Sequence, residues 1–292
     1  MLNYTICKSW PFEPVTQAFT ERDTILYALS LGCGQSADTA RALPYVYERK
    51  LEAIPSMACV LGSAGMWWSA PETGVDWRAI VHGQQDLHLF APLPVSGRVE
   101  AMHKVVAIAD KGAGRGAVAV VQRDLYHSGT REPMARSFST TMLRGDGGFS
   151  AADGRSDALP EALPALPDRE ATIHATYSIA PDAALLYRLL GDLNPLHVDP
   201  EAARAAGFDR PILHGLCTYG MAARAALEHL PGAHARTLRR IAARFTAPIW
   251  PGETVRFEFW PDVAKVGRFQ FRAQVDARGS RVLDHGLIEF NG

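Results

Sequence analysis

The feature that most constrains the fold is an abrupt change of composition in the middle of the chain. Residues 145–168 read GDGGFSAADGRSDALPEALPALPD, mostly glycine, alanine, proline, serine and aspartate. Such a stretch has too few bulky apolar side chains to order a core, so it is typical of a linker. It splits the 292 residues into halves of similar size, each long enough for a domain. We therefore predict one domain over residues 1–150, a linker over 151–168 and a second domain over 169–292.

The two halves resemble diverged copies of one unit. Three similar segments recur in the same order, and the residues that mark them are 160, 156 and 153 positions apart: Tyr27 and Tyr187, Pro92 and Pro248, Gly114 and Gly267. Self-similarity at a nearly constant spacing is the signature of an internal repeat. Each pair alone is weak evidence, but their common order and spacing predict a duplication.

Apolar periodicity predicts the elements of the second half. A strand over 172–179 precedes a helix over 181–190, which ends at Gly191, the residue type preferred just after a helix. A longer helix follows over 214–230, with its apolar residues on one stripe. Alternating apolar and polar residues mark antiparallel strands over 255–260, 269–275 and 282–290. A long helix followed by an antiparallel sheet, occurring twice, predicts an α+β fold in which each sheet wraps around a helix.

The first half departs from this plan where its central helix belongs. Residues 53–82 contain five residues that break or weaken helices: Pro55, Gly62, Gly65, Pro71 and Gly74. We expect no full central helix there. Because a broken segment fills less volume than a helix, the concave face of this half's sheet should have space left over.

Composition excludes several classes of function. The net charge of −1, from 30 basic and 31 acidic residues, argues against a nucleic-acid binder that relies on broad positive charge. The four cysteines form no C-x-x-C pair, which favours free thiols in a reducing compartment. The N-terminus lacks a secretory signal, and the longest uncharged run, residues 53–71, is too interrupted for a membrane helix. We expect a cytoplasmic protein that binds neither nucleic acid nor membrane.

The segment that carries chemistry follows the first helix of the second half. Asp192, Asn194 and His197 lie within six residues, and Pro195 prevents the helix from continuing. A tight turn of this kind can direct a carboxylate and an imidazole into one space, where they form an acid/base pair able to deprotonate water. The same residues also make a good structural turn, because Asp and Asn cap backbone groups.

A second feature favours the catalytic interpretation. The run Pro211-Ile212-Leu213-His214-Gly215 opens the long helix. Backbone N–H groups at a helix start can bind a developing oxyanion. An acid/base pair followed by such donors suits chemistry on an acyl thioester.

These motifs together resemble a known family. The run from Tyr187 to His197, with Gly191, Asp192, Asn194, Pro195 and Leu196 between, followed by 211–216, resembles the MaoC-like (R)-specific enoyl-CoA hydratases, also called hydratase 2. The resemblance covers most of the chain and extends to the two-repeat form in the hydratase part of peroxisomal multifunctional enzymes. It implies a double hot-dog fold with two antiparallel sheets, each on a helix, and an N-terminal repeat without the catalytic turn. Gly32-Cys33-Gly34 stands where that turn would be, as the resemblance requires.

The resemblance also implies roles for individual residues. Asp192 and His197 match the catalytic pair, Asn194 matches a supporting amide and Gly215 matches the backbone donor to the thioester oxygen. Softer matches for acyl-CoA contacts are His82, Gly83, Lys111 and Phe245. The implied activity is reversible hydration of a trans-2-enoyl-CoA to an (R)-3-hydroxyacyl-CoA. We expect an acyl-CoA substrate, no cofactor beyond its CoA, no metal and a homodimer.

Alternatives remain within this interpretation. A hot-dog dehydratase could act on a branched, steroid or carrier-protein-linked 3-hydroxyacyl thioester, and a non-catalytic subunit could simply bind acyl-CoA. Lys111 could be an ordinary solvated turn residue. The space left by the broken helix predicts an apolar tunnel from the catalytic turn into the first repeat, lined partly by residues 57–68, unless Trp67 and Trp68 plug it.

Overall fold

The computed structural model describes residues 2–35, 40–151 and 154–291. The first half contains three helices and five strands: α1 (Tyr4–Lys8), β1 (Val15–Phe19), α2 (Glu21–Ser30), α3 (Leu43–Val46), β2 (Ile80–Leu89), β3 (Gly97–Asp110), β4 (Ala117–His127) and β5 (Pro133–Leu143). The second half contains β6 (Ile173–Ser178), α4 (Ala183–Tyr187), α5 (Pro200–Ala205), α6 (Gly215–His229), β7 (Leu238–Phe245), β8 (Thr254–Pro261), β9 (Arg268–Val275) and β10 (Ser280–Phe290). Every element predicted for the second half is present within a few residues of its predicted bounds.

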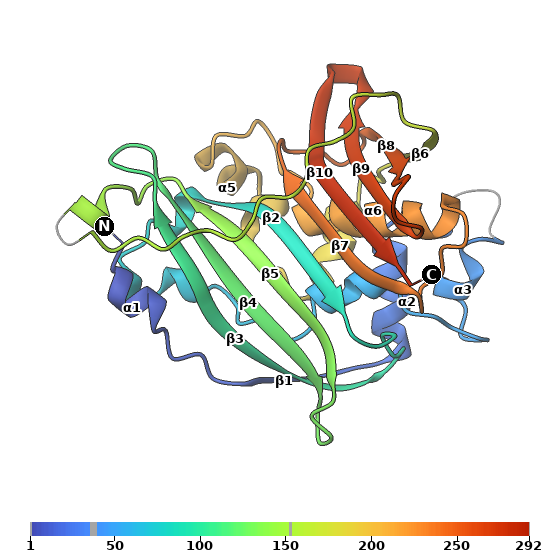
Figure 1. Ribbon diagram of the computed structural model, residues 1–292, viewed down its shortest axis with the longest axis horizontal. Coiled ribbons are helices and arrows are strands. Elements are labelled where there is room, and N and C mark those ends of the chain that lie inside the picture. Colours follow the sequence, from blue (N-terminus) through green and yellow to red (C-terminus); the bar gives the residue numbers. More distant parts are fainter. Residues whose placement is uncertain (1, 36–39, 152–153, 292) are drawn as a thin grey trace.

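All ten strands form one antiparallel sheet in the order β1-β3-β4-β5-β2-β7-β10-β9-β8-β6. The second half has the same strand order as the first half, read from the opposite edge of the sheet: β6-β8-β9-β10-β7 corresponds to β1-β3-β4-β5-β2. The predicted duplication requires this symmetry. The two predicted sheets are continuous, because β2 pairs with β7 at the centre (Figure 1). Asp86 opposes Ala242 in the middle of that pairing, 156 residues further along. The equivalent tyrosines Tyr27 and Tyr187 also meet, with ring centroids 6.2 Å apart.

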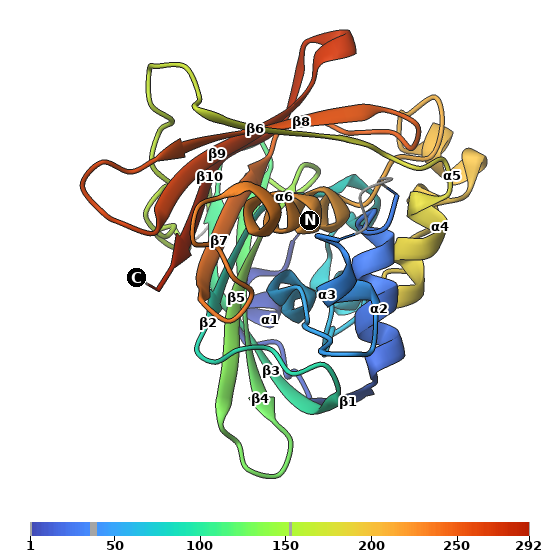
Figure 2. The ribbon, with the colours of Figure 1, turned by 90° about the vertical axis from the view of Figure 1, so that its right-hand side faces the viewer.

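The second half wraps around α6, as Figure 2 shows. Ten consecutive residues of this helix, from Cys217 to Ala226, are buried. Gly220 is required where α2 crosses α6, because a Cβ there would lie 2.6 Å from Leu31 Cδ2 and 2.8 Å from the Tyr27 hydroxyl. This close approach packs the two halves together.

The corresponding segment of the first half contains no α-helix, as predicted. It is a series of short 3-10 turns: η1 (Pro55–Cys59), η2 (Trp67–Ser69), η3 (Pro71–Thr73) and η4 (Trp77–Ala79). Residues Met57 and Ala58 are buried in the main core, but Met66 is 48% exposed. The segment therefore covers the sheet only in part.

Residues 154–168 form no helix or strand and run along the outer face of the sheet (Figure 1). They are nevertheless anchored. Leu163 is buried against Ala242 and Leu287. The Asp157 carboxylate accepts hydrogen bonds from Lys8 Nζ at 2.6 Å and from the Ile108 backbone N–H at 2.8 Å. The predicted linker is thus a strap held to both halves.

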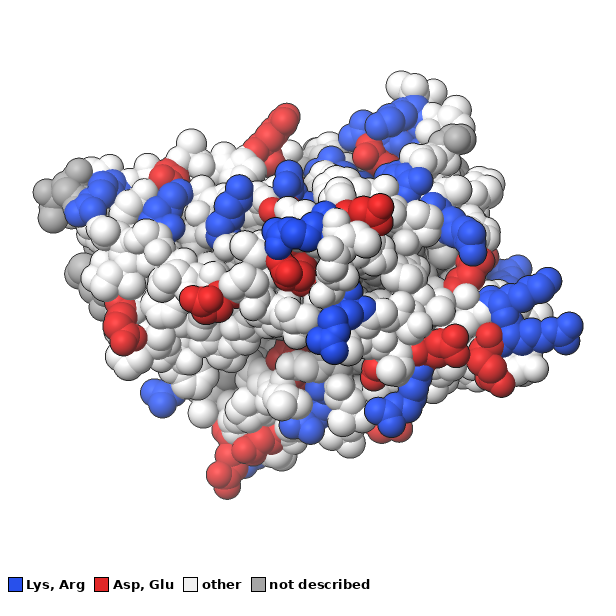
Figure 3. Space-filling view, turned by 90° about the horizontal axis from the view of Figure 1, so that it is seen from below, with Lys and Arg blue, Asp and Glu red and all other residues white. Residues whose placement is uncertain are grey.

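Charged side chains of both signs lie interspersed on the face seen from below (Figure 3). No single-sign field dominates that face. Within the described ranges, no helix is both long and apolar enough to cross a lipid bilayer.

Candidate active site

The predicted catalytic turn leaves the end of α4 through a 3-10 turn, η6 (Arg188–Leu190). Gly191 adopts φ 113°, a left-handed conformation that a side chain would strain, and so ends the helix. Asn194 then caps a second 3-10 turn, η7 (Pro195–His197), by accepting a hydrogen bond from the Leu196 N–H at 3.1 Å. The Asn194 backbone N–H donates to Asp192 Oδ1 at 3.2 Å. The turn thus holds the Asp192 carboxylate through the backbone, while the Asn194 side chain braces the next turn.

His197 is half-buried at the end of η7. Its Nδ1 lies 2.8 Å from the backbone oxygen of Ile212. Because a carbonyl oxygen only accepts, Nδ1 carries the proton and Nε2 is left with a lone pair. Burial lowers the pKa of His197 below its usual value, so the ring is neutral at pH 7. A neutral imidazole with a free Nε2 has the form required of a general base.

A second histidine packs against this one. The His214 ring is stacked on the His197 ring, with centroids 3.7 Å apart and an interplanar angle of 26°. His214 Nε2 lies 3.2 Å from the backbone oxygen of Asp192. One nitrogen or oxygen from each of Asp192, His197 and His214 lies within 4.8 Å of the other two. Three such donors could hold a metal ion, and one nitrogen of each ring remains without a carbonyl partner.

The predicted oxyanion donor lies at the start of α6. Gly215 is the first residue of that helix, so its N–H has no partner within the helix. A Cβ at Gly215 would lie 3.2 Å from two atoms of the Phe245 ring. Phe245 in turn contacts His82, with ring centroids 4.7 Å apart. The structure therefore brings Gly215, Phe245 and His82 together beside the catalytic turn.

His82 is held in a neutral state. Burial lowers its pKa to about 4, although Asp192 nearby acts in the opposite direction. Its Nε2 hydrogen-bonds the Gln84 backbone oxygen at 3.1 Å. The intervening Gly83 lies where the β2–β5 register shifts, and a Cβ there would contact Met142 at 3.1 Å. A side chain at this irregularity of the strand would therefore require Met142 to shift by a few tenths of an ångström.

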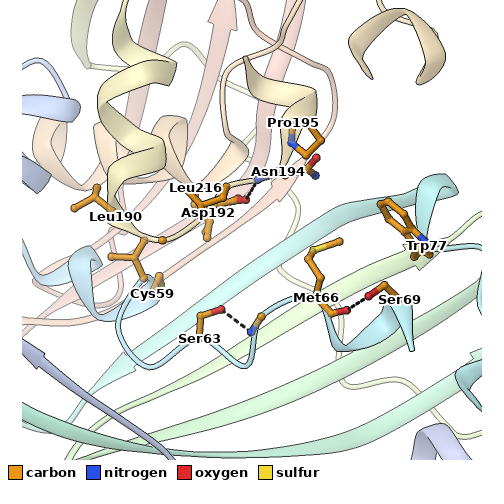
Figure 4. A pocket seen from close by; sticks show the side chains of 14 residues that line it. Cys59, Ser63, Met66, Ser69, Trp77, Leu190, Asp192, Asn194, Pro195 and Leu216 are labelled. Carbon is orange, nitrogen blue, oxygen red and sulfur yellow. Dashed lines mark hydrogen bonds between the residues drawn. The ribbon is translucent and has the colours of Figure 1, made fainter. Parts of the chain in front are cut away.

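A cavity of about 460 Å³ separates the predicted catalytic turn from the first half. Figure 4 shows the turn on one side of it and the broken segment on the other. The first half contributes Cys59, Val60, Ser63, Gly65, Met66, Ser69 and Trp77, and the second half contributes Leu190, Gly191, Asp192, Leu193, Asn194, Pro195 and Leu216. Most of these side chains are apolar, and Asp192 is the one charged residue among them. The cavity can therefore hold an apolar chain with its reacting end at Asp192.

Five residues in the predicted lining segment, 57–68, border this cavity. Trp67 and Trp68 do not plug it. They stack on each other at 3.7 Å, and Trp67 also packs against Trp10 from the N-terminal region. Trp77 was missed because no motif singles it out. Lys111 lies exposed in the turn after β3 and does not line the cavity, so its role stays a prediction.

Each half of the chain matches a known protein family. Residues 163–278 match the family model of the MaoC like domain, and residues 17–145 match that of the MFE-2 hydratase 2 N-terminal domain. The chain is 38% identical to 3-hydroxyacyl-thioester dehydratase Y of Mycobacterium tuberculosis, over 95% of each protein. The chain belongs to the MaoC-like hydratase 2 family.

Two further relatives support membership of the hydratase 2 family. A probable enoyl-CoA hydratase 2 of Dictyostelium discoideum is 34% identical, over 94% of this chain and 92% of that protein. The crystal structure of a MaoC-like dehydratase from Phytophthora capsici superposes with a TM-score of 0.84, at 30% identity and over 99% of each chain. The double hot-dog fold of the hydratase 2 family, predicted from the sequence, is confirmed.

Proposed function

We propose that this protein catalyses the reversible hydration of a trans-2-enoyl-CoA to an (R)-3-hydroxyacyl-CoA. The observation that carries the proposal is the position of Asp192 in the wall of a mostly apolar cavity, with one of its carboxylate oxygens within 4.8 Å of a His197 ring nitrogen and with the start of α6 at Gly215 nearby. Relatives named enoyl-CoA hydratase 2, from an amoeba and a plant, share 34% and 33% identity with this chain. The chain is thus assigned as a hydro-lyase.

In this proposal the thioester oxygen accepts a hydrogen bond from the Gly215 N–H. That donor stabilises the negative charge that develops on the oxygen as the double bond is attacked. His197 Nε2 removes a proton from a water molecule whose oxygen bonds to the β-carbon. Asp192 takes up a proton from solvent and delivers it to the α-carbon. His197 then releases its proton to solvent, so that one water is added and both groups are restored.

The two repeats would divide the work. We assign the catalytic turn to the domain over residues 169–292 and substrate binding to the domain over 1–150. The acyl chain would enter the cavity against the broken segment. His82, Gly83 and Phe245 would contact the thioester end of the CoA, and Lys111 would approach its phosphates from the turn after β3.

A second function is the same chemistry in reverse. The relative with 38% identity is named a 3-hydroxyacyl-thioester dehydratase, which favours dehydration as the working direction. The site is the same in both directions, because His197 and Asp192 exchange their roles as base and acid. Initial rates measured in each direction, with CoA and carrier-protein thioesters, compare the two.

The proposal needs no cofactor besides the CoA of the substrate. Dialysis against EDTA should leave turnover unchanged, although Asp192, His197 and His214 lie close enough to hold a metal ion. We further propose a homodimer in the cytoplasm. Light scattering of the purified protein checks the first, and fractionation of cells checks the second.

The direct test is incubation with crotonyl-CoA while the enoyl absorbance is followed. The expected result is loss of absorbance, with a product that chiral analysis identifies as the (R)-3-hydroxy thioester. If crotonyl-, octenoyl- and decenoyl-CoA all remain unchanged while the folded protein binds them, the protein is an acyl-CoA binder and the proposal is wrong.

A further inference from the structure

One polar side chain beside the catalytic pair has no part in the chemistry described above. His214 is only 1% exposed and precedes the first residue of α6. Its Nδ1 is buried and has no hydrogen-bond partner among the described residues. A buried polar atom without a partner is costly, so its retention calls for a reason.

We propose that His214 is the positioning residue of the catalytic pair: its imidazole fixes the Asp192 backbone through Nε2 and supports the His197 ring on its face. The activity readout below rests on the proposed hydratase function, whereas the spectroscopic readout does not.

The hydrogen bond that His214 makes determines its tautomer. His214 Nε2 lies 3.2 Å from the carbonyl oxygen of Asp192, which can only accept. Nε2 therefore carries the proton. Nδ1 must then be a bare lone pair, because adding a proton there would place a charge in a site that offers it no acceptor. Burial and the neighbouring His197 accordingly lower the pKa of His214 to about 4.

Two imidazoles stacked at 3.7 Å cannot both be cations without strong repulsion. The other groups around His214 are the Asp192 carboxylate, the Arg188 guanidinium and the Tyr187 ring, whose centroid is 5.0 Å away. Because His214 stays neutral, His197 can take up a proton from water without charge repulsion from the ring stacked on it.

Asp192 lies in an exposed turn, and its carboxylate accepts a hydrogen bond from the Asn194 backbone N–H at 3.2 Å. The bond from His214 ties this turn to α6, and hence to Gly215, the proposed oxyanion donor. A displacement of about 1 Å in a catalytic group can cost roughly 10²-fold in rate. Loss of this tie should therefore lower kcat rather than weaken substrate binding.

Two substitutions distinguish the hydrogen bond to Asp192 from the ring stacking on His197. His214→Phe keeps a flat ring on His197 but removes the donor, and kcat should fall at least about 10-fold with KM changed less than about 3-fold. His214→Gln keeps an N–H near the position of Nε2 and should retain kcat within about 3-fold. His174→Phe is the matched control, since His174 makes the same kind of bond, to the Ala171 carbonyl at 3.1 Å, on an exposed strand.

The outcomes are decisive in both directions. Near-full turnover of His214→Phe, with an unchanged Tm, would overturn the proposal. Equal losses in the Phe and Gln variants at equal Tm would also overturn it, because the donor would then be irrelevant. If His214→Phe does not fold, the Gln variant and the spectroscopic measurement below still decide.

The second measurement needs no activity. In protein labelled with ¹⁵N-histidine, NMR reports which ring nitrogen carries the proton. His214 should show the neutral form with the proton on Nε2 from pH 8 down to pH 5. A proton on Nδ1, or a cation at pH 6, contradicts the proposal. If the unaltered protein hydrates no enoyl thioester, the proposed function is wrong. The NMR measurement still tests the proposed tautomer of His214, because it does not depend on activity.

Discussion

Acyl-chain length provides the sharpest test of the cavity. Each CH₂ transferred from water to an apolar site contributes about 0.8 kcal/mol, so the six extra carbons of decenoyl-CoA over crotonyl-CoA could contribute about 5 kcal/mol if fully buried. The cavity is open on one side, since Met66 and Leu193 are 48% and 61% exposed. Counting half of the burial leaves about 2.4 kcal/mol, or a roughly 50-fold higher kcat/KM for the ten-carbon substrate.

A substitution in the wall checks that this preference arises in the cavity. Val60→Phe places a ring where Val60 now borders the space, and should lower kcat/KM for trans-2-decenoyl-CoA while sparing crotonyl-CoA. Val263→Phe is the control, because Val263 is 96% exposed and is not among the residues of the cavity wall. Steady-state kinetics with both substrates measure the ratio. A clear preference of the unaltered enzyme for crotonyl-CoA would refute the reasoning.

Three further predictions concern the turn, its counterpart and pH. Asp192→Asn and His197→Gln should each lower kcat at least about 10²-fold with Tm preserved, and a folded variant with near-full turnover would refute the assigned roles. Cys33 is buried, with a pKa raised to about 12, so Cys33→Ala should keep kcat within a few-fold in the same assay. Burial lowers the pKa of His214 to about 4, so between pH 6.5 and 4 the unfolded chain binds a proton that the folded chain does not. The free energy of unfolding should therefore decrease as the pH is lowered through this range, by up to about 1.4 kcal/mol per pH unit from this group. In His214→Gln, Tm should depend less on pH.

The elements of the second half could be predicted because each is encoded locally. Gly191 ends its helix through its own left-handed backbone, and Pro195 starts the next turn through its ring. The continuity of the sheet could not be predicted in this way. It depends on β2 pairing with β7, and β2 places Asp86 at that junction, where Arg240 Nη2 lies 2.8 Å from its carboxylate. The partner of such a buried charge is about 150 residues away, outside the reach of any local pattern.

The candidate site shows the same division. Asp192, Asn194 and His197 lie in one short motif, so their proximity follows from sequence. The stacking of His214 on His197 depends on how α6 meets the turn, and Trp77 reaches the cavity from the other repeat. The broken segment signalled that space would be left in the first half, but not which side chains would border it.

The two counterpart turns of the duplicated fold face different segments of the chain. The catalytic turn faces the broken segment of the first repeat, which leaves the space open. The counterpart turn after α2 faces the intact α6, from which Arg224 Nη1 donates to the Leu31 carbonyl at 3.0 Å.

Arg224 is fixed in that position by its neighbours. Its Nε lies 2.7 Å from Glu228, with both side chains at least 93% buried, and its guanidinium lies 4.3 Å from the centroid of the Tyr177 ring. Removing one partner of a buried ion pair strongly destabilises the folded protein, because the other charge is left buried without compensation. The arginine is therefore held against the turn that leads to Cys33. The intact central helix thus packs an arginine against the counterpart turn, whereas the broken segment leaves a cavity beside Asp192.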